Sequence, residues 1–326
     1  ARLVAGCAAA VDVAATIGRA ARSKLRFFRP AMCGALGATA GMANILGLDA
    51  RTARSALGLT YSQLSGTMQA HVEGSPALPM QIGFNARSAL LAIELATRGV
   101  AGPRDFLEGP HGYFTLIDPE WDPTEFEGFE TRHAITELSH KPFPSGRLTH
   151  PAIDGVQRLI AAHGVRAEHV SAVRLFLPPL AMRLVGRPIK PDLTGNYARL
   201  CLPYVVARTL LSGSVGLGDF SEALLRDGPT HALAARVELH GDGSTDENAV
   251  VPQRVEIELR DGTRLDQRVD AALGSPENPL PRVAQIEKVK ACLAGILPDG
   301  RADELIRAID ALHEAPDVVG LADILV

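Results

Sequence analysis

The hydrophobic pattern of this chain changes its period twice, and these two changes limit the folds that the chain can adopt. From residue 1 to about residue 120, apolar residues recur at helical spacing, which predicts helices over Val4–Ala21, Met32–Leu48, Ala53–Met68 and Gly83–Arg98. From about residue 128 the pattern includes strand-like alternation. After residue 274 it is helical again, over Val283–Leu297 and Ala302–Leu312. The fold class expected is therefore mainly α: an all-helical domain formed by both chain ends, with an inserted α+β domain.

The middle section carries the signals of a small sheet with helices. Alternation predicts strands over Val170–Leu177, Ala235–His240, Arg254–Leu259 and Arg264–Val269. Asp261-Gly262 is typical of a tight hairpin turn between the last two strands. Helices are expected at Pro151–His163 and Tyr197–Ser212. We expect the helical domain to comprise residues 1–125 and 275–326, and the α+β domain to comprise residues 126–274.

Composition excludes several classes of protein. The net charge of −4 gives no basic excess for binding nucleic acid. The four cysteines lack C-x-x-C spacing, which favours reduced thiols and a cytoplasmic location. The apolar N-terminus resembles a signal peptide, but Asp12 interrupts it, so we expect a core helix and no membrane partner. Because the chain begins within a helical pattern and without Met, we expect an earlier segment to be missing.

Several motifs are better explained by structure than by chemistry. Gly34, Gly37 and Gly41 follow no strand and lack dinucleotide-loop spacing, so close helix packing is the interpretation. The acidic run Asp242–Asn248 departs from a calcium loop and is expected to be a solvated connection. The histidines and cysteines show no metal-ligand spacing, and no G-x-S-x-G motif is present. No metal site is predicted.

One segment, His140–Asp154, has the composition of a carboxylate site. Lys141, Arg147 and His150 precede or open a helical pattern, and Pro151 suits the first turn of a helix. Thr149 or His150 would lie at the cap, where free N–H groups attract anions. His150 is also titratable near neutral pH, although a single histidine is more often structural.

Two further residues have both a functional and a structural interpretation. Tyr204 lies in an otherwise apolar helix, where a buried tyrosine usually only finds a hydrogen-bond partner. Arg187, in Gly186-Arg187-Pro188, is suited to binding a carboxylate with two hydrogen bonds, but it also fits a surface salt bridge.

Five segments together resemble a known family. They are Glu73-Gly74, Gln81–Pro103, Phe106–Phe114, Lys141–Pro151 and Gly274–Pro279. In order and spacing they are similar to the MmgE/PrpD family, whose members include 2-methylcitrate dehydratases, cis-aconitate decarboxylases and iminodisuccinate epimerases. The similarity runs over essentially the whole chain.

The resemblance implies a helical domain covered by an α+β lid, usually in a homodimer. It implies a site between the two domains that uses no metal or organic cofactor. The reaction implied is proton abstraction or delivery beside a carboxylate. By resemblance, His150 and Tyr204 are the catalytic residues, and Lys141 and Arg147 hold substrate carboxylates.

The chain also departs from the family pattern. Arg29 stands where members commonly carry histidine, and Leu78 and Gln81 stand where many carry lysine and histidine. Leu78 neither binds a carboxylate nor transfers a proton. Gln81 still forms hydrogen bonds, and Arg29 keeps a positive charge without releasing its proton. Arg29, Gln81 and Arg187 are therefore predicted as substrate contacts.

Two classes of function follow. The first is an enzyme acting on a di- or tricarboxylate, with a dehydratase-type lyase preferred and an epimerase, isomerase or decarboxylase as the alternative. The second is a degenerate member that binds a carboxylate or a partner without turnover. We favour the enzyme, because a histidine grouped with several arginines is usually functional.

Overall fold

The computed structural model describes residues 1–129, 131–298 and 300–325, which form two compact units. The first unit comprises residues 1–138 and 310–316. The second comprises residues 139–309 and the end of the chain from Asp317. In this division the segment 275–309 groups with the α+β unit, whereas the sequence assigns it to the helical domain; that assignment stays a prediction.

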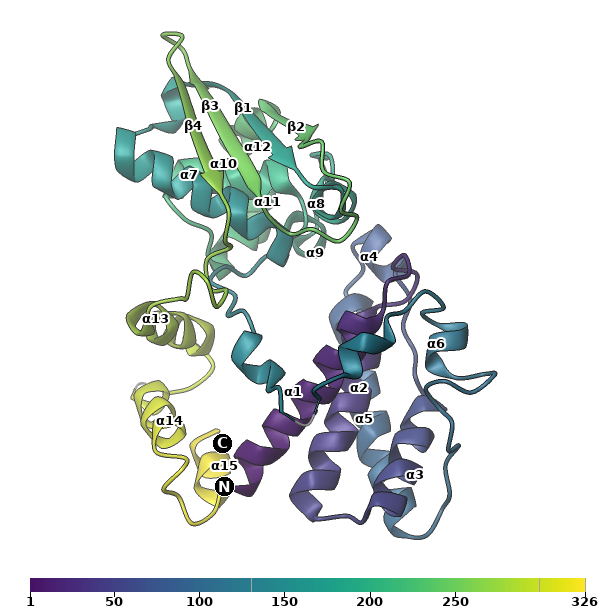
Figure 1. Ribbon diagram of the computed structural model, residues 1–326. Helices are drawn as coiled ribbons and strands as arrows, with labels where there is room; N and C mark the ends of the chain where they lie inside the picture. Colours follow the sequence, from purple (N-terminus) through teal and green to yellow (C-terminus); the bar gives the residue numbers. More distant parts are fainter. Residues whose placement is uncertain (130, 299, 326) are drawn as a thin grey trace. The chain divides into compact units, whose positions relative to one another are not determined.

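In the described residues of the first unit, all regular elements are helices (Figure 1). Its long helices are α1 (Arg2–Ala20), α2 (Arg29–Leu46), α3 (Ala50–Tyr61) and α5 (Ala77–Thr97). Shorter elements are α4 (Gln69–Glu73), α6 (Tyr113–Leu116), η1 (Pro123–Phe126) and η2 (Ala134–Glu137). The four predicted helices are thus confirmed, except that α3 ends at Tyr61, before the predicted Met68. Thr67 instead forms an isolated β-bridge with Phe27, which requires extended backbone.

Close packing of α1 on α2 depends on two glycines of α2. A Cβ atom at Gly37 would overlap the carbonyl oxygen of Ala10, and one at Gly41 would overlap that of Gly6. The predicted packing role of these glycines is confirmed, whereas Gly34 has open space where its Cβ would lie.

Helix α1 has two properties that bear on its environment. Its length and composition would allow it to cross a membrane. In the structure Ile17 and Ala20 of α1 are buried in a cluster with Met32, Cys33 and Leu36 of α2. Their burial fits the predicted core helix.

The second unit is built on a four-stranded sheet with the order β2-β1-β3-β4. The strands are β1 (Val170–Leu177), β2 (Val237–Gly241), β3 (Gln253–Leu259) and β4 (Arg264–Val269). Strand β1 pairs parallel to β2 and antiparallel to β3, which pairs antiparallel to β4. One face of the sheet packs on helices α7 (His150–His163) and α10 (Leu202–Ser212), and α12 (Gly228–Ala234) packs on α10 (Figure 1). All four predicted strands and the hairpin are present, so the predicted fold class is confirmed.

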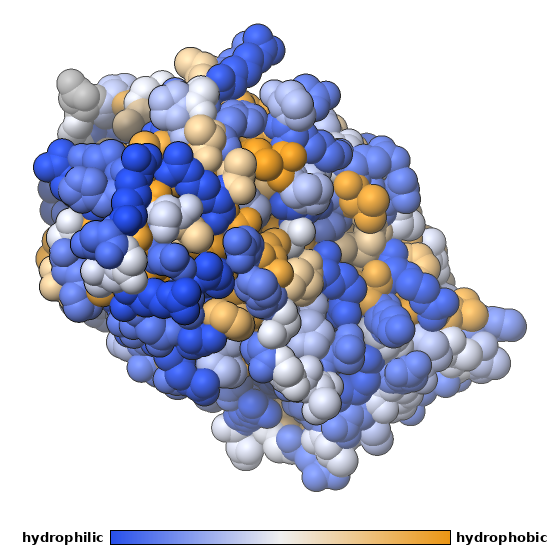
Figure 2. Space-filling view, turned by 90° about the horizontal axis from the view of Figure 1, so that it is seen from above, coloured by the Kyte–Doolittle hydropathy of each residue, from blue (hydrophilic) through white to orange (hydrophobic). Residues whose placement is uncertain are grey.

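The two faces of this sheet differ in chemistry. The helix-facing residues Val173, Leu175, Val255 and Ile257 are fully buried in the core of the unit. Arg174 alternates with Val173 and Leu175 on β1 and therefore lies on the opposite face. There it forms ion pairs with Glu256 and Glu258 at 2.7 and 2.9 Å. The molecular face in Figure 2 is mainly hydrophilic, and its apolar side chains lie in small separate groups.

Shorter elements complete the second unit: η3 (Arg147–Thr149), η4 (Ala167–His169), α8 (Pro179–Val185), α9 (Gly195–Ala198), η5 (Leu217–Phe220), α11 (Glu222–Leu225), α13 (Arg282–Leu293) and α14 (Arg301–Asp310), with α15 (Val319–Leu325) near the chain end. The predicted helix Tyr197–Ser212 is divided into α9 and α10. The division falls at Cys201, whose backbone is extended and forms a β-bridge with Gly186.

Candidate functional site

The loop before α7 is fixed by its own hydroxyl groups. The Thr149 Oγ1 donates to the carbonyl oxygen of Gly146 at 2.8 Å and also lies 2.8 Å from Ser145 Oγ. Residues 147–149 form the 3₁₀ turn η3, which continues directly into α7. Thr149 therefore has helical backbone angles and forms no side-chain cap. Thr149 is the N-cap residue of α7, as one of the two predicted alternatives, but its hydroxyl is used within the loop and does not cap the helix.

His150 is the first residue of α7 and is 1% exposed. Its Nε2 lies 3.3 Å from the carbonyl oxygen of Ser145, and its ring packs edge-on against Phe143 with centroids 5.4 Å apart. A carbonyl only accepts, so Nε2 carries the hydrogen and Nδ1 is the acceptor of the neutral ring. Burial, followed by the charge of Lys141, lowers the pKa of His150 to about 4. The imidazole is therefore neutral at pH 7.

Three cations surround this histidine in the second unit. The Lys141 Nζ donates to the Ser145 carbonyl at 3.5 Å, and the charges of Arg147 and Lys288 also act on His150. Partial burial, then Lys288 and Arg147, lower the pKa of Lys141. Among the residues that the structure describes, no carboxylate forms an ion pair with Lys141, Arg147 or Lys288. The charge of Arg147 also acts on the exposed carboxylate of Glu277. The group is thus a basic cluster without a direct ion pair, next to a neutral base.

Lys288 is the member of this cluster that the sequence does not reveal. It lies in the middle of α13, far along the chain from the loop 141–150. The neighbouring residues in the sequence do not distinguish Lys288 from any other exposed lysine on a helix. Only the packing of α13 near the loop brings Lys288 to Lys141.

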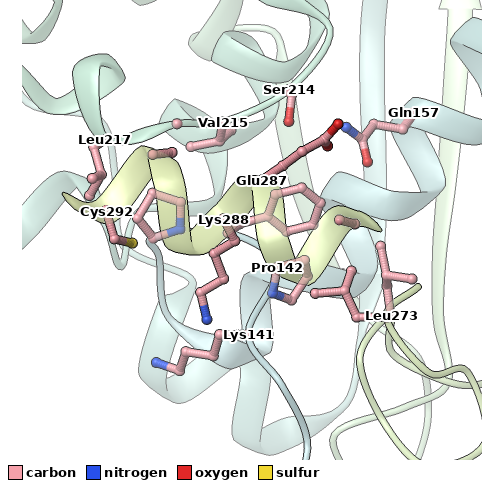
Figure 3. Close-up of a pocket in the computed structure, with 16 residues that line it drawn as sticks. Lys141, Pro142, Gln157, Ser214, Val215, Leu217, Leu273, Glu287, Lys288 and Cys292 are labelled. Carbon is pink, nitrogen blue, oxygen red and sulfur yellow. The ribbon is translucent and has the colours of Figure 1, made fainter. Parts of the chain in front are cut away.

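Lys141 and Lys288 both line a pocket of about 600 Å³ in the second unit (Figure 3). The walls of the pocket come from the loop 141–144, the loop 214–217 and α13. Phe143 lines the pocket and separates it from His150, which is not itself a lining residue. This arrangement can hold an anion at the lysines, with the imidazole behind the aromatic ring.

Tyr204 lies on α10 and is fully buried. Its hydroxyl donates to the carbonyl oxygen of Asp219. The side chain of Asp219 in turn accepts from Arg208 Nε at 2.8 Å and from the backbone N–H of Gly216 at 2.7 Å. Burial raises the pKa of Tyr204 to about 12. Tyr204 thus helps to fix the loop that contains Gly216, a lining residue of the pocket, and its catalytic role stays a prediction.

Arg187 also belongs to the second unit. Its guanidinium lies over the ring of Tyr197, 5.0 Å from the centroid, and its carbonyl accepts from the Cys201 thiol. Burial lowers the pKa of Arg187. The stacking fixes the guanidinium plane, and its role toward a substrate stays a prediction.

Arg29 and Gln81 lie in the first unit and have partners there. Arg29 donates to Asp118 Oδ1 at 2.7 Å and to the carbonyl oxygen of Ser23 at 2.9 Å. Gln81 Nε2 donates to the carbonyl oxygen of Thr67 at 3.2 Å. An arginine neutralised by a carboxylate is a weaker anchor for an anionic substrate, and both substrate roles stay predictions.

Comparison with known proteins identifies the family from both parts of the chain. Residues 1–125 match the MmgE/PrpD N-terminal domain, and residues 143–314 match the MmgE/PrpD C-terminal domain. The chain belongs to the MmgE/PrpD family. The family predicted from the five sequence segments is thereby confirmed. His150, Arg147 and Lys288 lie within the part that matches the family's C-terminal domain, and Lys141 lies two residues before it.

Curated members of the MmgE/PrpD family are similar at low identity. Cis-aconitate decarboxylase of Mus musculus is 25% identical over 311 residues, which cover 92% of this chain and 62% of the mouse protein. Cis-aconitate decarboxylase of Aspergillus terreus is 24% identical over 319 residues, covering 90% of this chain and 64% of that protein. The mitochondrial 2-methylcitrate dehydratase of Yarrowia lipolytica is 26% identical over 157 residues, covering 44% of this chain and 29% of that protein. The chain spans less than two thirds of the length of each.

Proposed function

We propose that this protein is a lyase that acts on a small tricarboxylate by moving a proton at a carbon beside a carboxylate. The observation that carries the proposal is the basic group of Lys141, Arg147 and Lys288 around the neutral His150. Charge-assisted hydrogen bonds from lysine and arginine are the usual means of holding carboxylates. The names of the relatives, which refer to cis-aconitate and 2-methylcitrate, support this class of substrate.

His150 is proposed as the general acid and base. With Nε2 hydrogen-bonded to Ser145, the Nδ1 lone pair is the position that accepts a proton. A bound carboxylate would add negative charge near the imidazolium and raise the pKa of His150 toward neutrality. Proton transfer would then depend on substrate binding, which limits exchange with water in the free protein.

Dehydration is the first reaction considered. A proton leaves the carbon beside a carboxylate, hydroxide leaves the neighbouring carbon, and a double bond forms between them. Decarboxylation is the second, and it is favoured by the relatives matched over 90% or more of this chain. In that reaction the carbon–carboxylate bond breaks, CO₂ leaves, and the carbon takes up a proton.

The test is to follow 2-methylcitrate, citrate, cis-aconitate and iminodisuccinate by NMR in D₂O with the purified protein. Product formation is expected, and the product distinguishes the two reactions: loss of CO₂ places a deuteron on the carbon that carried the carboxylate, whereas loss of water removes a proton and adds no deuteron. His150→Gln should abolish turnover, and Arg147→Gln should raise KM by about tenfold or more through the loss of a charged contact.

Arg264→Gln is the matched control, because Arg264 is exposed on the β3–β4 hairpin. Its KM should equal that of the unaltered protein. Inversion of a centre with deuterium uptake would indicate an epimerase instead. Binding of a tricarboxylate with no exchange or product would overturn the enzyme proposal in favour of the non-catalytic alternative.

A further inference from the structure

The pocket of the second unit has two ends of different chemistry. In Figure 3 the ammonium groups of Lys141 and Lys288 extend to the same side, whereas the Glu287 carboxylate extends the other way, toward Gln157. Lys288 and Glu287 are consecutive on α13, so their side chains diverge along the pocket. The basic end is therefore separated from the only acidic side chain that lines the pocket in the described part of the chain.

Between these ends the wall of the pocket is apolar. Phe143 and Leu280 are buried, and Leu273 and Ala284 are partly buried beside them. Pockets of about 300–1,000 Å³ hold ligands well beyond the size of a single carboxylate group. At about 600 Å³ this pocket has room for an apolar substituent next to the lysines.

We propose that this pocket binds a carboxylate bearing an unbranched alkyl chain, with the carboxylate between Lys141 and Lys288 and the chain along Phe143, Leu273 and Ala284. Two like charges on separate elements line one cavity, and a carboxylate offers two oxygens, one for each ammonium. The alkyl chain would cover the apolar wall and remove it from water.

This inference deepens the proposed function and rests on it only for the preference for a carboxylate. It assigns an alkyl substituent to the substrate, and it makes Lys288 a residue that determines specificity. It also predicts that simple alkyl carboxylates bind without being turned over.

Titration calorimetry with acetate, butanoate, hexanoate and octanoate tests the inference directly. The dissociation constant should fall by about fourfold for each added methylene until the wall is covered. Lys288→Met should weaken binding of every member by about tenfold and keep the dependence on chain length. Lys290→Met is the matched control, since Lys290 is on the same helix but binds Asp303 at 2.7 Å, and it should change nothing.

A second measurement uses the Cys292 thiol as a reporter of occupancy. Cys292 lines the pocket and is exposed, and Cys7 is an exposed thiol of the first unit. Octanoate should slow alkylation of Cys292 by iodoacetamide and leave that of Cys7 unchanged.

The inference would be overturned by an affinity independent of chain length, or by equal binding of inorganic phosphate and octanoate. Equal effects of Lys288→Met and Lys290→Met would do the same. Tricarboxylate turnover without binding of alkyl carboxylates would refute this inference alone. Binding of alkyl carboxylates, together with no turnover of any tricarboxylate, would refute the lyase proposal alone.

Discussion

His150 and Lys141 reach the same acceptor, the carbonyl oxygen of Ser145, at 3.3 Å from Nε2 and 3.5 Å from Nζ. The shared acceptor holds a neutral imidazole beside an ammonium group within one loop. Burial, followed by the charge of Lys141, lowers the pKa of His150. Burial, followed by the charges of Lys288 and Arg147, lowers the pKa of Lys141. A carboxylate bound at the ammonium would favour the charged form of each group and raise both pKa values.

The first prediction concerns stability against pH. The pKa of His150 is about 4 in the folded protein and about 6.5 when unfolded, so the unfolded chain binds more protons between these values. The free energy of unfolding is therefore highest, as far as His150 is concerned, above pH 6.5, and it decreases as the pH falls toward 4. The free energy of unfolding should contain a His150 contribution that falls by about 2 kcal/mol from pH 7 to pH 5.

Urea unfolding of the protein and of His150→Gln at both pH values measures this contribution. The difference between pH 7 and pH 5 should be about 2 kcal/mol smaller in the variant, because glutamine does not titrate. Equal pH dependence in the two proteins would show that His150 is not held neutral by burial.

The second prediction separates a structural role of Arg29 from an anchoring role. The side chain of Asp118 is 5% exposed, and Arg29 is its ion-pair partner at 2.7 Å. Arg29→Met should lower the free energy of unfolding by about 3 kcal/mol, because it leaves a buried carboxylate without its partner. Urea unfolding measures the loss.

The matched control is Arg22→Met, because Arg22 pairs with Asp122 at the surface and its loss should cost less than about 1 kcal/mol. If Arg29→Met instead kept full stability and raised KM for the tricarboxylate, Arg29 would be a substrate anchor and the structural interpretation would be wrong.

The third prediction uses two glycines of α2 that differ in their surroundings. Gly37→Ala should destabilise the protein by about 1–3 kcal/mol, because the methyl group would meet the backbone of α1 at Ala10. Gly34→Ala has open space and should be neutral or stabilise by up to about 1 kcal/mol through higher helix propensity. Thermal unfolding of both variants compares them, and equal effects would contradict the observed α1–α2 packing.

The fourth prediction concerns the homodimer that the family resemblance implies, which stays a prediction. One side of α5 carries exposed apolar side chains at helical spacing: Met80, Phe84, Leu90 and Leu91. On the same side of α5, Arg87 lies three residues before Leu90 and Glu94 lies three residues after Leu91. Two copies of α5 related by a two-fold axis at this point would therefore place Arg87 of one copy opposite Glu94 of the other.

Leu91→Glu should convert the dimer to a monomer in light scattering coupled to size-exclusion chromatography, because it buries a charge in the contact. Leu46→Glu, at another exposed position at the end of α2, should leave the mass unchanged. A monomeric unaltered protein, or a dimer in both variants, would exclude this side of α5 as the interface.

Local sequence pattern predicts the secondary structure well where the element depends on its own residues. Strand β1 has the predicted limits, because alternation over Val170–Leu177 reflects one buried and one exposed face. The pattern fails beyond Tyr61 and at Cys201, since pairing with Phe27 and with Gly186, far away in sequence, imposes extended backbone there.

The sequence by itself determined the family, the helical and α+β parts and the segment Lys141–His150 as a basic loop at a helix start. These follow from the order of residues along the chain and from short-range geometry. Only the tertiary structure showed that Lys288 lies near Lys141 and that Arg29 forms an ion pair with Asp118. It also showed that the Tyr204 hydroxyl donates to the carbonyl oxygen of Asp219. The physical reason is that periodicity fixes which side of an element is buried, whereas the partner of a charged or hydroxyl group depends on which distant element packs against it.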